Sequence, residues 1–338
     1  MSHERNEQNQ RVIDLIQADR FEDALEPARA AVERAKREKG DNHPDLALAL
    51  NNLGELCHAL GDFSAAEAAL RQSLEIYTAA YGEREDVAEA LTNLAELYMA
   101  QARYADAEPL MQKALAIQEK RRSQDDPELT PALNALAMVY QARGRYDAAK
   151  PLLERALSIL EGTLADNHPD LGPVLTSLAT IAQATGALED AETLLRRVLS
   201  IYENSVGAMH PAFAKTLCQL AEIYLAMGVY PAAEPLLKQS LDIRKACLPD
   251  NHPEIGESLD RLALLYQSRG EPAQAEPLMR QSIEVYSSAF GQEHPAVAQA
   301  QNNLAELFLN QGRHEDAAPL LEASLAIRET LLGAEHPA

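Results

Sequence analysis

The sequence of 338 residues contains no tryptophan, only three cysteines and few basic residues. Lys and Arg total 30 against 52 Asp and Glu, which gives a formal net charge of -22. This balance excludes nucleic acid as an expected partner, because phosphates require cationic neutralisation, and it argues against anionic membrane surfaces. No apolar stretch approaches the roughly 18 residues of a membrane span, and residues 1–10 are polar, unlike a signal peptide. We therefore expect a cytoplasmic protein.

The three cysteines, Cys57, Cys218 and Cys247, have spacings that match no zinc or redox motif. We interpret them as small buried or half-buried residues in a reducing compartment. Runs of β-branched residues are also missing, whereas alanine and leucine dominate. This composition predicts packed helices rather than strands.

The most informative feature that is present is a period. A leucine in a similar sequence context recurs at intervals of 41 residues once and 42 residues five times. These anchor leucines are Leu53, Leu94, Leu136, Leu178, Leu220, Leu262 and Leu304. A fixed period in this range indicates one supersecondary unit that is stacked many times.

The unit that begins at Pro211 shows what each repeat encodes. The preceding His210 is expected to cap a helix over residues 212–227, since proline fits the first helical turn. Gly228 is expected to end that helix in the left-handed conformation, and a second helix then runs to about Cys247. The equivalent breaks are Gly61, Gly144, Gly186, Gly270 and Gly312, with Ala102 in place of glycine once.

Alanine recurs at one position of the second helix, where the paired helices can approach closely. These residues are Ala66, Ala107, Ala149, Ala191, Ala233, Ala275 and Ala317. We predict an all-α solenoid of stacked antiparallel helix pairs. Residues 1–42 form a degenerate first pair, residues 43–335 form seven repeats, and residues 336–338 are the start of a further repeat or the chain end.

A tyrosine four residues after the anchor leucine and an alanine thirteen residues after it are similar to the tetratricopeptide repeat, which normally has 34 residues. The 42-residue version resembles the tetratricopeptide domain of kinesin light chains and related bacterial proteins over about residues 20–338. The segments that carry this resemblance are 41–45, 166–170, 250–254, Asn51-Asn52-Leu53 and Asn302-Asn303-Leu304.

The resemblance implies a right-handed superhelix whose first helices line a concave groove that takes extended peptides. In kinesin light chains the asparagine before the anchor leucine holds the peptide backbone. Here that position is occupied by Asn52, Asn93, Ala135, Ser177, Gln219, Arg261 and Asn303. The three asparagines either bind a peptide in this way or bond a neighbouring helix. Arg261 either joins them or pairs with Glu222 or Glu257.

The position two residues after the anchor leucine is expected to face the same groove. Four of the seven residues there are glutamates, namely Glu55, Glu96, Glu222 and Glu306. They would repel the acidic carboxyl-terminal tails that another class of tetratricopeptide proteins binds. We therefore expect a neutral or basic protein or peptide partner.

Metal binding and catalysis are not indicated. The six histidines that precede proline, His43, His168, His210, His252, His294 and His336, recur about 10 Å apart in successive repeats, too far to share a zinc ion. Glu55 and His58 have the spacing of a carboxylate-bridged metal site, but no matching second pair is found. No phosphate-binding loop or hydrolase motif occurs. We expect no enzyme activity, no metal and no cofactor.

The sequence thus predicts a protein-interaction scaffold that binds an extended segment of its partner in the groove. Two alternatives stay open. The chain could be a structural module that self-assembles, as a homo-oligomer, through an exposed terminal repeat at its carboxyl-terminal end. It could also be the regulatory or sensor part of a larger signalling protein.

Overall fold

The computed structural model describes residue 15 and residues 20–332. This part of the chain contains fifteen α-helices, one short 3-10 helix and no strand, which confirms the all-α prediction. The chain divides into two compact units, residues 1–163 and residues 164–338. Among the described residues, no helix is both long enough and apolar enough to cross a bilayer.

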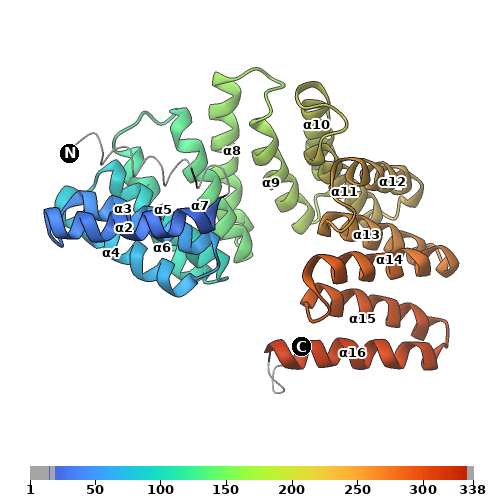
Figure 1. The fold of residues 1–338 in the computed structure, drawn as a ribbon. Coiled ribbons are helices and arrows are strands. Elements are labelled where there is room, and N and C mark those ends of the chain that lie inside the picture. The colour runs from blue at the N-terminus through green and yellow to red at the C-terminus, as the bar shows by residue number, and fades with distance from the viewer. Residues whose placement is uncertain (1–14, 16–19, 333–338) are drawn as a thin grey trace. The chain divides into compact units, whose positions relative to one another are not determined.

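The first unit consists of one unpaired helix followed by three helix pairs (Figure 1). Its elements are α2 (Phe21–Lys39), α3 (Pro44–Ala59), α4 (Phe63–Tyr81), α5 (Glu85–Ala100), α6 (Tyr104–Glu119), η1 (Pro127–Leu129), α7 (Thr130–Ala142) and α8 (Tyr146–Thr163). The first helix of the degenerate pair predicted over residues 1–42 falls outside the described residues, apart from Leu15.

The second unit contains four helix pairs, in which each helix packs on the next along the chain (Figure 1). Its elements are α9 (Leu171–Ala184), α10 (Leu188–Ser205), α11 (Pro211–Ala226), α12 (Tyr230–Cys247), α13 (Pro253–Ser268), α14 (Pro272–Phe290), α15 (Pro295–Asn310) and α16 (His314–Leu332). We call the first member of each pair a first helix and the other a second helix.

Histidine caps four of the first helices, as predicted. The Nδ1 atom accepts the backbone N–H two residues further on at 3.0–3.3 Å in His43, His210, His252 and His294. His168 accepts the same bond from Asp170, but its helix begins only at Leu171, so this histidine caps a turn ahead of the helix. His336 lies outside the described residues.

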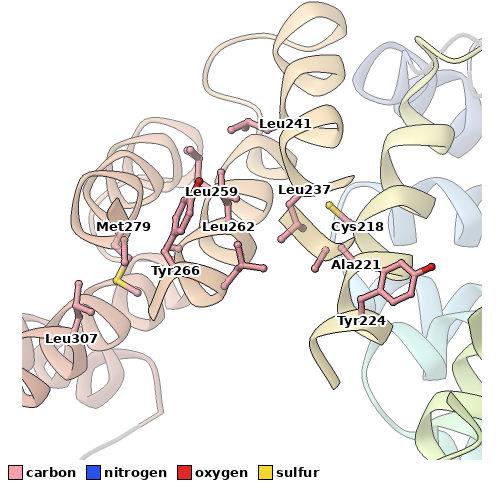
Figure 2. Packing of buried hydrophobic residues seen from close by; sticks show 14 of the residues in the cluster. Cys218, Ala221, Tyr224, Leu237, Leu241, Leu259, Leu262, Tyr266, Met279 and Leu307 are labelled. Carbon is pink, nitrogen blue, oxygen red and sulfur yellow. The ribbon is translucent and has the colours of Figure 1, made fainter. Parts of the chain in front are cut away.

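The predicted turns and close packing are also confirmed. The six glycines that end first helices have φ between 68° and 81°, and the seven recurring alanines of the second helices are fully buried. Ala102 adopts φ 56°, the only described non-glycine residue with positive φ. Figure 2 shows part of the core of the second unit, where Leu237, Leu262 and Met279 from three successive helices belong to one cluster. One cysteine departs from prediction, because Cys247 is exposed at the end of α12.

Polar side chains join each helix pair to the next in an arrangement that the sequence did not reveal. The Tyr98 hydroxyl on α5 donates to Glu67 at 3.0 Å and accepts from Arg71 at 2.7 Å, both on α4. Arg103, just before α6, donates to Glu67 at 2.8 Å and stacks 4.1 Å from the centre of the Tyr98 ring. We call this combination of a second-helix glutamate, an aromatic ring of the next first helix and a basic residue a clasp.

The clasp recurs within both units. The glutamate and ring are Glu108 and Tyr140 in the first unit, and Glu192 and Tyr224, Glu234 and Tyr266, and Glu276 and Phe308 in the second. Where phenylalanine replaces tyrosine, Arg313 stacks 4.0 Å from the Phe308 ring and bonds Glu276 at 2.7 Å. Stacking and charged hydrogen bonds together make such a contact stronger than an exposed ion pair.

Ala102→Gly should stabilise the first unit by about 1 kcal/mol, because alanine bears a steric cost in the left-handed region that glycine lacks. Gly144→Ala, the reverse change at the equivalent turn, should destabilise by a similar amount. Urea unfolding monitored by circular dichroism measures both. A loss of stability in Ala102→Gly would contradict the assigned backbone conformation.

Glu234→Gln should lower stability by about 1 kcal/mol at pH 7, since Glu234 accepts from Lys238, Tyr266 and Arg269. Glu284→Gln on the exposed face of α14 is the matched control and should change stability by less than about 0.5 kcal/mol.

The hydrogen bond from Lys238, together with those from Tyr266 and Arg269, lowers the pKa of Glu234. Its stabilising contribution is therefore present above the unfolded pKa and is lost as the pH falls through the folded pKa. Urea unfolding at several pH values should show the difference between wild type and Glu234→Gln shrinking on acidification. A difference that grows would contradict the clasp.

Candidate binding surface on the first helices

The predicted site residues lie on one face of each first helix. On α5 this face carries Glu89, Asn93 and Glu96, whose spacings of four and three residues align them along the helix. Leu94 and Tyr98 of the same helix are buried. We call the three equivalent positions of each first helix its inner stripe.

In the second unit the inner stripes of α13 and α15 line a hollow of about 400 Å³. Its lining residues are Glu257, Asp260, Arg261, Leu264 and Gln267 of α13, Met279 and Tyr286 of α14, and Gln299, Asn303 and Glu306 of α15. The structure thus brings together three residues singled out from the sequence: Arg261, Asn303 and Glu306.

Arg261 is engaged by neighbouring carboxylates, which was one of the two alternatives. Its Nε atom lies 3.0 Å from Glu222 on α11, and its Nη2 atom lies 3.9 Å from Glu257. Burial raises the pKa of Glu222, an effect that Arg261 opposes and Glu257 reinforces. The positive charge of Arg261 is therefore compensated within the protein.

Arg244 of α12 is a functional neighbour that sequence reasoning missed. Its side chain is only 1% exposed, and its Nη2 atom lies 3.2 Å from Glu257. Nη1 donates to the Glu254 carbonyl and to Ser258, both at 2.8 Å. This buried cation fixes Glu257 on the inner stripe. Its place in the repeat was an available signal, since Tyr202 and Tyr286 occupy the equivalent position, but an arginine on an amphipathic helix is expected at the surface.

Asp260 and Tyr286, which form the inner wall of the hollow, were also missed. The Tyr286 hydroxyl donates to Asp260 Oδ2 at 3.2 Å. Burial raises the pKa of Asp260, and the nearby Ser282 hydroxyl, the hydrogen bond from Tyr286 and the charge of Arg261 offset only part of this effect. Gly256 makes room for the ring, since a Cβ atom there would lie 2.7 Å from a Tyr286 carbon. Glycine inside a helix was the one available signal, because it marks a close approach.

Asn303 shows how a groove asparagine is held. Its Oδ1 atom accepts from Gln299 Nε2, one turn earlier on α15, at 2.8 Å. The Oε1 atom of Gln299 accepts in turn from Arg328 of α16 at 3.2 Å. The amide of Asn303 is therefore oriented by its own stripe and by the second helix behind it.

The predicted residues of the first unit differ in exposure. Asn52 is buried and its Nδ2 atom makes no hydrogen bond within the described part of the chain, whereas Asn93 is half-buried. Glu55 and Glu96 are exposed. Burial nevertheless raises the pKa of Glu96, and repulsion from Glu55 adds to this. Glu96 is thus exposed to water and at the same time partly desolvated by the protein around it.

The inner stripes also carry residues that were not singled out. Glu89 adds a further carboxylate on α5, and burial together with repulsion from Asp86 raises its pKa. Large apolar side chains are exposed on other stripes, namely Leu48, Met138 and Leu264. The surface therefore combines negative charge with isolated apolar contacts.

A second hollow, of about 810 Å³, lies in the first unit on the second helices α4 and α6. Leu74, Leu110 and Pro109 contribute apolar lining. The charged residues Arg71 and Asp106 at its edge are already engaged by the clasp of Tyr98. Of its charged lining residues, only Glu75 has no ion-pair partner in the described part of the chain.

Within residue 15 and residues 20–332, no three histidine, cysteine, aspartate or glutamate side chains come together as a metal site would require. The Glu55 and His58 pair on α3 belongs to no such group.

Solved structures share this architecture. One is a set of tetratricopeptide-like repeats, nearly identical to one another, from a Podosopora anserina protein assigned as a kinesin light chain. Its sequence is 30% identical to this chain, the TM-score is 0.54, and the match covers 61% of this chain and 98% of that one. BtubC (BKLC) from P. vanneervenii is 19% identical, with a TM-score of 0.56 and coverage of 74% and 94%. The apo quorum sensor NprR from B. thuringiensis is 16% identical, with a TM-score of 0.72 and coverage of 96% and 87%.

Matches to family models identify the family of the chain. Among curated proteins, no significant match was found. A tetratricopeptide-repeat model matches residues 212–288 and 255–330. The model of the MalT-like tetratricopeptide region matches residues 13–239, about two thirds of the sequence. The chain therefore belongs to the family of MalT-like tetratricopeptide-repeat regions.

Proposed function

We propose that the chain is a protein-interaction scaffold whose inner stripes bind an extended, basic or neutral segment of a protein partner. Stacked helical repeats present elongated surfaces that suit such segments. The repeat helices and their connections take up residues 20–332, so binding rather than catalysis is the proposed role.

The distribution of paired and unpaired carboxylates carries this proposal. The clasp glutamates on the second helices are engaged by basic residues, as at Glu67 and Glu276. On the inner stripes, Glu55, Glu96 and Glu306 have no ion-pair partner among the described residues. The inner stripes thus carry more unpaired carboxylates than cations, with Lys215 on α11 as an exposed basic residue among them, and this balance favours a basic partner.

Asparagine side chains would add directional contacts to this charge. An amide offers both a donor and an acceptor and can bond a peptide backbone at two points. Asn93 and Asn303 are accessible for this role. Asn52 occupies the same repeat position but is more deeply buried. Arg261, already paired, would shape the stripe rather than supply free charge.

Self-association is the second candidate, because α16 exposes Leu321 and Leu325 on its surface. Two leucines one turn apart form a small apolar face that a second copy could cover. The cytoplasmic location and a sensor role in a larger protein stay predictions from the sequence.

Matched extended peptides that are basic, neutral or acidic test the proposal by fluorescence anisotropy. The basic peptide should bind most tightly, and its affinity should fall as salt rises from low to moderate concentration, because exposed charges are screened. Tighter binding of the acidic peptide would contradict the proposal. Binding of none of the peptides would overturn it.

Glu96→Gln should weaken binding of the basic peptide several-fold while stabilising the free protein slightly, by about 0.5 kcal/mol or less. Glu284→Gln, on the exposed surface of α14, removes the same charge outside the inner stripes and outside both hollows and should leave affinity unchanged. Equal effects of both substitutions would show that net charge, and not the stripe, governs binding.

The stability effect of Glu96→Gln should also depend on pH in a defined direction. Because the folded pKa of Glu96 is raised above its unfolded value, the ionised glutamate costs stability above the folded pKa. Protonation removes this cost as the pH falls. The advantage of glutamine should therefore be present at neutral pH and disappear in acid, as urea unfolding at several pH values can measure.

A further inference from the structure

The hollow formed by α13, α14 and α15 holds acceptors that the protein itself does not fully use. Glu257 is fixed by Arg244 and Arg261. By contrast, the buried Oδ1 atom of Asp260 accepts no hydrogen bond within the described part of the chain. The Ser282 hydroxyl donates to the Met279 carbonyl at 3.0 Å and lies near enough to Asp260 to lower the pKa of that carboxyl.

Glu306 completes the negative side of the hollow. It lies exposed at the rim on α15 and forms no ion pair with any described residue. Arg261 adds the one positive charge of the lining, and Glu222 at 3.0 Å together with Glu257 compensates it. The hollow therefore offers two carboxylates, one inside and one at the rim, that lack a cation.

The remaining walls are apolar or aromatic. Leu264 is exposed toward solvent, whereas Met279 and Tyr286 lie deeper. A long basic side chain fits this combination, because its methylene stem packs on apolar surface while its charged end reaches a carboxylate. Neither an acidic side chain nor a short apolar one would satisfy both parts.

We propose that this hollow anchors a lysine or arginine side chain of the bound segment, with its cationic end between Asp260 and Glu306 and its stem against Leu264 and Met279. The proposal rests on the proposed function for the source of that side chain. It goes further in assigning one hollow, one chemical class of side chain and two counter-ions.

The Met279 methyl group allows a direct test, because it is buried in the wall of the hollow. Full-length protein labelled with carbon-13 at the methionine methyls would be titrated with the N-acetyl amides of lysine, arginine, norleucine and glutamate. Lysine and arginine amides should shift the Met279 signal in a saturable way, and the other two should not. The signal of Met111, buried in the first unit, should stay constant.

Two substitutions identify the counter-ions. Asp260→Asn should weaken binding of the lysine amide by about tenfold, since a desolvated charge pair is lost. Glu306→Gln, at the exposed rim, should weaken it about twofold to threefold without a risk to folding. Asp242→Asn, an exposed aspartate on α12, is the control and should have no effect.

Each other outcome would overturn the proposal. Equal shifts with norleucine would define an apolar site, and no shift with any amide would show that the hollow takes no side chain. Unchanged lysine binding in both Asp260→Asn and Glu306→Gln would exclude these counter-ions. The proposed function is tested separately. Peptide binding by anisotropy without a lysine response would contradict only the proposed side-chain site in the hollow, whereas a lysine response without peptide binding would contradict the proposed scaffold function.

Discussion

The clasp is the interaction on which the rest of the structure depends. Each helix pair buries its alanines and leucines internally, but a stack also needs a fixed contact from one pair to the next. A glutamate such as Glu67 supplies it by accepting from a tyrosine and an arginine of the following repeat. Because the acceptor is only partly exposed and the ring is covered by a guanidinium, the contact is directional as well as attractive.

This use of cations determines the electrostatics of the other face. The chain has far fewer basic than acidic residues, and the clasps engage several of the arginines. The inner stripes are consequently left with carboxylates whose pKa values burial and mutual repulsion raise, as for Glu96 and Glu89. The clasp carboxylates have lowered pKa values where basic groups bond them, as for Glu276. Acidification therefore weakens the contacts between helix pairs. On the surface proposed to bind a partner, it removes the repulsion between ionised carboxylates.

The features that recur in every repeat could be predicted from the sequence. The period, the glycine turns, the histidine caps and the buried alanines depend on local geometry, which the same residues impose in each unit. The sequence did not predict Asp260, Tyr286 or Arg244, because their roles arise from contacts across three helices. Asp260 precedes Arg261, which was singled out from the sequence. Its contact with Tyr286 nevertheless depends on Gly256, which leaves room for the Tyr286 ring.

Specific recognition in such a scaffold must come from departures from the repeat. A perfectly repeated stripe would offer equivalent contacts in every unit and could not fix the register of a bound segment. In the second unit, Arg244 and Arg328 occupy the position that is tyrosine at Tyr202 and Tyr286, and Arg244 holds Glu257 in place. The adjoining hollow combines the carboxylates of Asp260 and Glu306 with an apolar lining. A segment that inserts one side chain there would be held in a single register, with the regular stripes supplying the remaining contacts.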